Sequence, residues 1–270
     1  MSTKTIFITG SSTGLGRATA KLFAGRGWKV IATMRSPDKE TELGGVPGIT
    51  LLPLDVTRPE QIDAAVRSAL ALGPVDVVFN NAGYGLAGPL EGISDEQLVA
   101  QIDTNLLGVI RTTKAFTPHF RERGAGTFIA TTSIGGLIAL PFNSAYHATK
   151  WALQGWSESL SFELGKLGIA VKTVAPGGIK TDFAGRSLVL AQHPAYAALM
   201  GKALAVFMDP VRREKGSTAE QVAEVVWEAA TDGKDQVTYV AGEDAKALFA
   251  QRLSAGAEAF RKIIGQMFLG

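Results

Sequence analysis

Short hydrophobic runs alternate along the chain with longer stretches of helical periodicity. The runs are rich in Val, Ile and Phe, are bounded by Gly, Pro, Asn or Asp, and cover residues 5–9, 29–33, 49–54, 75–79, 126–131, 169–174 and 236–240. Buried parallel strands have this composition. The stretches between them predict helices over residues 15–24, 59–72, 95–116, 145–166 and 219–231. The alternation predicts an α/β Rossmann fold, a doubly wound parallel sheet of seven strands.

Two segments depart from this alternation. Residues 183–216 contain helical fragments, two prolines and the pair Arg212-Arg213. We interpret them as a helical insertion that covers the substrate, because long excursions in compact folds are often lids, with a second small domain as the alternative. Residues 245–270 form an amphipathic helical extension that either docks on the domain or contacts another subunit. No linker or repeat interrupts the chain, so residues 1–270 are predicted to form one domain.

Composition narrows the possible functions. The chain has 270 residues, of which 46% are hydrophobic and 19% charged, as in a globular protein with a buried core. The net charge is +2 without a basic run, so no nucleic-acid partner is expected. The chain has no cysteine and three histidines without metal-ligand spacing, so no disulfide, thiolate catalyst or metal site is expected. The first hydrophobic run is too short for a signal peptide or a membrane span, which favours a cytoplasmic protein.

A glycine-rich turn follows the first strand and opens the first helix. It reads Thr9-Gly10-Ser11-Ser12-Thr13-Gly14-Leu15-Gly16. Gly10 can adopt positive φ, while Gly14 and Gly16 let the start of the helix lie close to a diphosphate. Free amide groups and the helix dipole would then hold the phosphates. The context of strand, turn and helix predicts a dinucleotide site, and the alternative is a turn capped by Ser or Thr.

The end of the second strand bears on the choice of cofactor. A site for NAD places Asp or Glu there to bond the ribose hydroxyls. This chain has Arg35 instead, with Ser12 and Thr13 facing it from the turn. A guanidinium suits a phosphate through paired donors, so the sequence favours NADP(H) over NAD(H). An arginine that is merely solvated at a strand end is the alternative.

Three residues form a candidate catalytic group. Tyr146 and Lys150 are four residues apart and share one face of a helix, while Ser133 follows the fifth strand at the edge where such sheets bind ligands. A nearby ammonium and the positive nicotinamide ring lower the pKa of a tyrosine from about 10 towards the range of acid/base catalysis. We expect Tyr146 to exchange the proton of the reacting oxygen and Ser133 to hydrogen bond the same oxygen. An exposed tyrosine beside a solvated lysine is the alternative.

The spacing Gly-x-x-x-Gly-x-Gly together with Ser133, Tyr146 and Lys150 resembles the short-chain dehydrogenase/reductase family over roughly residues 4–182 and the last strand. The resemblance implies an NADP(H)-dependent oxidoreductase that interconverts a ketone or aldehyde and an alcohol. It implies that Lys150 also bonds the nicotinamide ribose and that Asn105 holds a water in the proton relay. Its further cofactor contacts are Asp55 and Val56 at the adenine, Asn81, Ala82 and Gly83 beside the adenosine ribose, and Pro176, Gly177, Ile179 and Thr181 at the nicotinamide. Asp55 alternatively caps the helix that follows.

Further details resemble the branch with 17-beta-hydroxysteroid and retinol dehydrogenases, namely residues 32–35, 81–85, 88–91 and 140–143. The expected substrate contacts are Ser133, Gly135, Leu140, Phe142, Tyr146 and Phe183. Most of them are apolar, so we expect a hydrophobic small-molecule ketone or alcohol. The family also implies a homo-oligomer, a dimer or tetramer joined through the long helices.

Three other functions stay open at this stage. One is an NAD(H)-preferring alcohol dehydrogenase of the same fold. Another is an NADP(H)-binding sensor without turnover, although such proteins usually lose the Tyr or the Lys. A sugar-nucleotide epimerase shares Tyr-x-x-x-Lys but usually has a longer chain and another glycine spacing.

Overall fold

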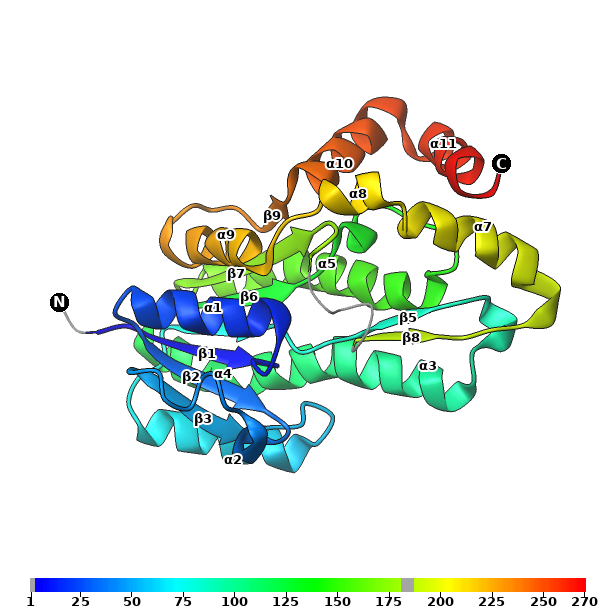
Figure 1. Cartoon of the computed structure of the whole chain (residues 1–270). Coiled ribbons are helices and arrows are strands. Elements are labelled where there is room, and N and C mark those ends of the chain that lie inside the picture. Colours follow the sequence, from blue (N-terminus) through cyan, green and yellow to red (C-terminus); the bar gives the residue numbers. More distant parts are fainter. Residues whose placement is uncertain (1–2, 181–186) are drawn as a thin grey trace.

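The computed structural model describes residues 3–180 and 187–270, and its centre is a seven-stranded sheet (Figure 1). The sheet runs in the order β3-β2-β1-β4-β6-β7-β9, and all its pairings are parallel. Its strands are β1 (Thr5–Thr9), β2 (Lys29–Met34), β3 (Ile49–Pro53), β4 (Val77–Asn80), β6 (Gly126–Thr131), β7 (Ile169–Pro176) and β9 (Thr238–Ala241). The predicted Rossmann fold is confirmed. The strand order reverses between β1 and β4, which is where such sheets bind ligands.

Helices cover both faces of the sheet. Helices α1 (Gly14–Gly25) and α9 (Ala219–Thr231) pack on one face, and α2 (Pro59–Ala71), α4 (Gly108–Arg123) and α5 (Ser144–Gly165) lie on the other (Figure 1). Alternate residues of β1 point to opposite faces. Ile6 and Ile8 join the core beneath α1 and α9, whereas Phe7 joins Phe116 and Phe120 in the core on the side of α2 and α4.

The helix predicted over residues 95–116 is divided in the structure. Helix α3 (Asp95–Ile102) begins with a capping box made by Ser94 and Gln97, and a π-helical turn (Asp103–Leu107) joins it to α4. The wider turn makes one extra residue bulge from the helix, and such bulges are frequent at functional sites. Here the turn contains Asn105, whose side chain is fully buried.

The insertion and the C-terminal extension pack together beyond the sheet. The insertion contains β8 (Leu188–Leu190), α7 (Ala197–Phe207) and α8 (Pro210–Glu214), and β8 pairs with β5 (Gly85–Ala87) in a two-stranded sheet that the sequence did not predict. The extension is two helices, α10 (Glu243–Ala255) and α11 (Ala257–Leu269), separated at Gly256 with φ +78°. Figure 1 shows α7 and α11 beside each other. Short 3-10 turns occupy Pro37–Lys39, Leu90–Gly92, Ile134–Gly136 and Pro194–Tyr196.

A buried ion pair ties β7 and β9 to the loop after α9. Lys172 donates to Asp232 at 2.7 Å and to the Tyr239 hydroxyl at 3.0 Å, and that hydroxyl donates to Asp232 at 2.7 Å. Burial raises the pKa of Asp232, but hydrogen bonds from Lys172, the Lys234 amide and Tyr239 outweigh it and hold the pKa at about 2. Burial and the carboxylate of Asp232 raise the pKa of Tyr239 well above its ordinary value.

Asp232→Asn should destabilise the protein by about 3 kcal/mol at pH 7, because the buried Lys172 ammonium loses its anionic partner. The folded-state pKa of Asp232 lies below its ordinary value of 3.8, so its contribution is present above that pH and is lost as the pH falls towards 2. Urea unfolding at stepwise lower pH measures the difference from the wild type, which should narrow in acid. The exposed neighbour Asp235, changed to Asn, is the control. A difference that stays constant down to about pH 2 would contradict the assignment.

Candidate active site

The structure brings the predicted catalytic residues together at the carboxyl end of the sheet. Ser133 lies just after β6, and Tyr146 and Lys150 lie one turn apart on α5. The Lys150 Nζ donates to the Thr131 carbonyl at 2.7 Å and lies 5.7 Å from the centre of the Tyr146 ring. The Ser133 hydroxyl accepts from the Gly135 amide at 3.0 Å and is near enough to the Tyr146 hydroxyl to lower the pKa of that group. The tyrosine hydroxyl is therefore held beside the serine, with the lysine beneath its ring face.

Burial dominates the electrostatics of this group. It raises the pKa of Tyr146, and the hydrogen bond with Ser133 opposes this increase. Burial also lowers the pKa of Lys150 to about 8, because only 5% of the residue is exposed. The protein groups thus keep Tyr146 protonated at neutral pH, which is the form that can donate to a carbonyl oxygen. The sequence predicted that the ammonium lowers the pKa of the tyrosine, whereas burial is the larger effect in the structure and raises it.

Asn105 is fixed by the backbone of Tyr84. Its Oδ1 accepts from the Tyr84 amide at 3.0 Å, and its Nδ2 donates to the Tyr84 carbonyl at 2.8 Å. Gln101 donates to the same carbonyl at 3.1 Å. A Cβ on Gly83 would lie 3.1 Å from Asn105 Oδ1 and 3.8 Å from Lys150 Nζ, so both side chains border that glycine. The water relay stays a prediction.

The glycine turn is closely packed against the end of β4. Gly10 has φ +67°, and a Cβ on it would lie 2.8 Å from the Cα of Ala82. Gly16 faces the Gly10 carbonyl and the amide of Asn81, so it also has no room for a side chain. Asn81 Nδ2 donates to the carbonyls of Thr9 and Gly10 at 3.2 and 3.0 Å. The motif around Asn81 therefore holds the turn in place.

The N-terminus of α1 fits an anionic group. Within the described residues, Thr13 makes no side-chain cap to the helix, and the first turn contains no acidic residue. The first amides of the helix are thus free for phosphate oxygens, which also profit from the helix dipole. The alternative of a turn capped by Thr13 does not hold. The residues of the turn, including Ser12, Gly14 and Leu15, therefore suit a diphosphate, which would not have to displace a side-chain cap.

Two arginines near the turn differ in their partners. Arg17 donates to the Ser12 carbonyl and forms ion pairs with Glu40, at 3.2 Å, and with Glu42. Arg35 is exposed and forms no ion pair with the described residues. Its guanidinium is therefore available to a ligand, whereas that of Arg17 is occupied by two carboxylates.

Asp55 lies at the end of β3 in the turn before α2. Its Oδ1 accepts from the amide and the hydroxyl of Thr57 at 3.0 and 2.8 Å, which closes the turn before the helix. The N-cap of α2 is Arg58 and has no side-chain cap, so Asp55 does not cap that helix. Burial raises the pKa of Asp55, but these hydrogen bonds and the charges of Arg35 and Arg58 hold it below its usual value. The neighbouring Val56 is buried against Gly108 of α4. Asp55 is thus an ionised carboxylate whose adenine contact stays a prediction.

The loop after β7 is braced by a residue that the sequence analysis did not single out. Pro176 pairs with Ala241, and Ile179 forms a bridge with Ser217. Asp244 in the first turn of α10 accepts from the Gly178 amide at 2.8 Å. An acidic residue in a first helical turn is common, so only the tertiary contact distinguishes it. The predicted contacts Thr181 and Phe183 lie outside the described residues.

The segment after Ser133 forms the other wall of the site. A Cβ on Gly135 would lie 2.7 Å from His147 Nε2, and the Leu140 amide donates to His147 Nδ1 at 3.4 Å. Burial lowers the pKa of His147 to about 4, so the ring is neutral and packs against this segment. Leu140 and Phe142 join an apolar cluster with α7 and α11. Phe142 has φ +59°, which is uncommon for a bulky residue and is typical of functional sites.

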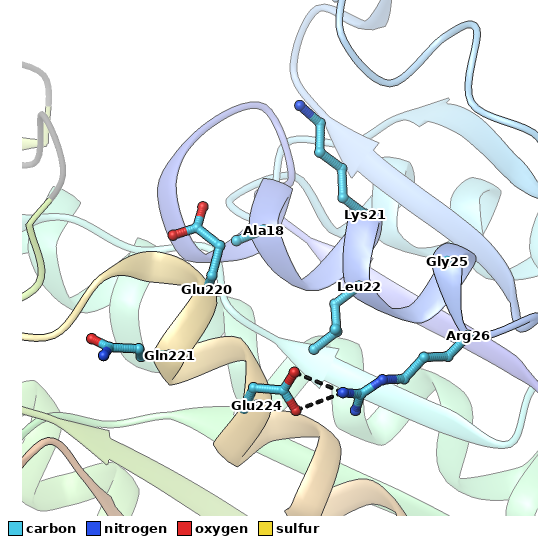
Figure 2. A pocket seen from close by; sticks show the side chains of 8 residues that line it. All are labelled: Ala18, Lys21, Leu22, Gly25, Arg26, Glu220, Gln221 and Glu224. Atoms are coloured by element: carbon cyan, nitrogen blue, oxygen red, sulfur yellow. Dashed lines mark hydrogen bonds and ion pairs between the residues drawn. The ribbon is translucent and has the colours of Figure 1, made fainter.

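A separate surface groove contains none of these residues. It lies between α1 and α9, has a volume of about 620 Å³, and is lined by Ala18, Lys21, Leu22, Gly25, Arg26, Glu220, Gln221 and Glu224 (Figure 2). Arg26 crosses it to Glu224 with contacts of 2.7 and 2.9 Å. The described residues contain no cluster that could hold a metal ion. Among the described helices, none has the length and the apolar character to cross a membrane.

The fold and this site define a class of protein, the Rossmann-type oxidoreductases that use a nicotinamide cofactor. Residues 4–188 match the family model described as short chain dehydrogenase. The chain therefore belongs to the short-chain dehydrogenase family, as the sequence motifs indicated.

Two relatives are similar over most of the chain. Oxidoreductase BOA17 of Botryotinia fuckeliana is 35% identical and covers 97% of this chain and 98% of its own. Retinol dehydrogenase 8 of Bos taurus is 34% identical and covers 83% of this chain and 76% of its own. The second of these belongs to the kind of enzyme that the branch motifs suggested.

Solved structures agree with the fold. A short-chain dehydrogenase from Streptomyces avermitilis has a TM-score of 0.85 at 31% identity and covers 98% of this chain and 96% of its own. ElxO with NADP bound has a TM-score of 0.74 at 25% identity, covering 88% and 98%. A tyrosine-to-phenylalanine variant of ElxO with NADPH bound has a TM-score of 0.75 at 26% identity, covering 89% and 96%.

Gly16→Ala should weaken NADPH binding and lower the free energy of unfolding by about 1–3 kcal/mol, because the new methyl group overlaps the Gly10 carbonyl. Fluorescence titration with NADPH and urea unfolding measure the two effects. Gly25→Ala at the end of the same helix is the control, since a Cβ there meets open space. It should leave binding unchanged, and equal effects of the two substitutions would contradict the packing argument.

Proposed function

We propose that this chain is an NADP(H)-dependent oxidoreductase that interconverts a ketone or aldehyde and an alcohol by hydride transfer. The observation that carries the proposal is the grouping of Ser133, Tyr146 and Lys150, in which Ser133 lies beside Tyr146 and the Lys150 Nζ lies 5.7 Å from the centre of the tyrosine ring. This group lies at the same edge of the sheet as the glycine turn. An acid/base residue and a dinucleotide site at one edge are what carbonyl reduction requires.

Each residue has a separate task in the proposed reaction. Tyr146 donates its proton to the carbonyl oxygen in reduction and takes the hydroxyl proton in oxidation. Ser133 hydrogen bonds the same oxygen and stabilises the charge that develops there. Lys150 holds a positive charge near the phenol and, by its place on α5, is within the reach expected for the ribose hydroxyls. The bound nicotinamide supplies or accepts the hydride.

Asn105 lies next to this group of residues. Its amide holds Tyr84 and borders Gly83, and Lys150 borders the same glycine. We propose that a water between Asn105 and Lys150 completes the proton path to solvent, as the family resemblance implies. The buried positions of both residues support a path that is shielded from bulk solvent.

The preference for NADP(H) over NAD(H) rests on Arg35. Its guanidinium is exposed at the end of β2 and forms no ion pair in the described part of the chain, although its charge lowers the pKa of Asp55. A 2′-phosphate would be held by paired donors of the kind that a guanidinium offers. The NADP-bound ElxO shows that this fold accepts the cofactor. An NAD(H)-preferring enzyme remains the alternative.

The substrate is proposed to be hydrophobic. Leu140 and Phe142 belong to an apolar cluster that also contains residues of α7 and α11. The insertion and the extension would then act as the lid above the reacting carbonyl. Retinol dehydrogenase 8, named for an apolar alcohol, is among the relatives, which supports this class of substrate.

We also propose a homo-oligomer in the cytoplasm. Phe162 on α5 is 80% exposed and Trp151 on the same helix is 41% exposed, which is unusual for aromatic residues unless another surface covers them. Contact between two copies through this long helix would bury both. The first hydrophobic run is the buried strand β1 of the sheet, which supports the cytoplasmic location.

Tyr146→Phe should lower kcat for ketone reduction by about 10²- to 10⁴-fold, because it removes the proton donor and retains the ring. NADPH oxidation with a panel of ketones, followed at the nicotinamide absorbance, measures the effect. NADPH affinity should stay within about threefold, as the NADPH-bound variant of ElxO suggests. A wild-type chain that binds NADPH but reduces no member of a broad panel would instead support a sensor.

Arg35→Asp should weaken NADPH binding by about 10- to 100-fold and change NADH binding much less, because only NADPH carries the 2′-phosphate. Fluorescence titrations with both cofactors measure the ratio. Arg67→Asp on the exposed side of α2 makes the same change in net charge and should leave the ratio unchanged. Equal losses for both cofactors in the Arg35 variant would refute the phosphate contact.

A further inference from the structure

Asp244 joins the C-terminal extension to the loop after β7. Its Oδ2 accepts from the Gly178 amide at 2.8 Å. The same loop is held by the Gly177 amide, which donates to the Ala241 carbonyl at 3.0 Å, and by Ser217, whose amide donates to the Gly178 carbonyl at 2.9 Å. Of these contacts, only the one from Asp244 is made by a side chain.

The carboxylate of the half-buried Asp244 lies against the backbone of two glycines. A Cβ on Gly177 would lie 2.6 Å from the Asp244 Cγ, so a larger residue at this position would collide with the carboxylate. On the other side, a Cβ on Gly242 would lie 2.6 Å from Asp244 Oδ1, and Gly242 has φ +98°. Oδ1 is buried and has no hydrogen-bond partner within the described residues. A buried polar oxygen without a partner lowers stability, so stability alone does not account for the residue.

A general role at the helix N-terminus does not explain Asp244 either. The preceding Glu243 lies in the same first turn, its side chain is 87% exposed, and it pairs with Lys246 at 2.8 Å. A carboxylate at this end of α10 interacts with the helix dipole from an exposed position just as well. Asp244, unlike Glu243, contacts the loop at Gly177 and Gly178.

We infer that Asp244 is a positioning residue that holds residues 176–180 in the conformation that receives the nicotinamide carboxamide. The inference rests on the proposed function and on the contact between Ile179 and the nicotinamide that the family resemblance implies. Asp244 restrains the peptide group before Gly178 through its amide, and the Ser217 amide restrains the one between Gly178 and Ile179 through the Gly178 carbonyl. Together they limit the positions that the Ile179 backbone can adopt. Hydride transfer is sensitive to displacements of about 1 Å in the reacting groups. Asp244 therefore acts on the reaction through the loop and does not touch the substrate.

Helix α10 also makes a cation–π contact near its other end. The Arg252 guanidinium lies 5.3 Å from the centre of the Trp151 ring, and the Trp151 indole donates to the Ile138 carbonyl at 3.4 Å. Ile138 belongs to the segment after Ser133. Helix α10 thus contacts the loop after β7 through its first turn. Near its last turn it contacts Trp151, which in turn holds the segment after Ser133.

The test compares Asp244→Ala and Asp244→Asn with the control Glu243→Gln. Each full-length variant is assayed with NADPH and with the 3-acetylpyridine analogue of NADPH, in which a methyl ketone replaces the carboxamide. Asp244→Ala should lower kcat with NADPH by about 10- to 100-fold and kcat with the analogue much less, so that discrimination between the cofactors is lost. Asp244→Asn should restore most of kcat, because an amide oxygen can still accept from the Gly178 amide. Glu243→Gln should behave as the wild type.

A second variant guards against misfolding. Gly177→Ala leaves Asp244 in the chain but drives a methyl group against its carboxylate, so it should also reduce discrimination between the two cofactors. Urea unfolding identifies variants that are folded. A folded Asp244→Ala protein with unchanged kcat and discrimination overturns the inference, and so does an equal loss with both cofactors, which indicates a structural role only.

A titration distinguishes failure of this inference from failure of the proposed function. If the wild type reduces no ketone, the affinities for NADP⁺ and for its 3-acetylpyridine analogue are measured by titration without turnover. Their ratio should fall towards one in Asp244→Ala and not in Glu243→Gln. An unchanged affinity ratio in Asp244→Ala would overturn the role of Asp244 even in that case.

Discussion

The contact between the glycine turn and the end of β4 is the constraint on which this structure depends. Thr9 accepts from the amides of Asn81 and Ala82 at 3.0 Å, and Asn81 returns hydrogen bonds to the carbonyls of Thr9 and Gly10. The approach is possible only because Gly10 and Gly16 have no side chains. It fixes the N-terminus of α1 at the point where the strand order reverses, and it leaves the first helical amides open to an anion.

The catalytic group depends on the same edge of the sheet through β6. Lys150 is held by the carbonyl of Thr131, the last residue of that strand, and Ser133 follows two residues later. Burial then sets the protonation of the group, because it favours the neutral phenol of Tyr146 and lowers the pKa of Lys150 to about 8. The positions come from the strands, whereas the reactivity comes from the low exposure that the surrounding elements impose.

The elements beyond the core close the other sides of the site. Helix α10 contacts the loop at Gly178 through Asp244 and the ring of Trp151 through Arg252, while α7 and α11 share an apolar cluster with the segment after Ser133. The C-terminal extension therefore packs against the loop after β7 and the segment after Ser133.

The sequence by itself determined the seven strands, the glycine turn and the group of Ser133, Tyr146 and Lys150, because periodicity and short spacing are local properties. It did not reveal the π-helical turn at Asn105, the pairing of β5 with β8 or the break at Gly256, since each is short and is stabilised by distant contacts. Only the tertiary structure decided which carboxylates and arginines form ion pairs or hydrogen bonds. Arg17 is paired with Glu40, whereas Arg35 is exposed. Asp244 accepts a hydrogen bond from Gly178, which lies 66 residues earlier in the chain. Charge pairing and burial arise from neighbours in space, which no local pattern records.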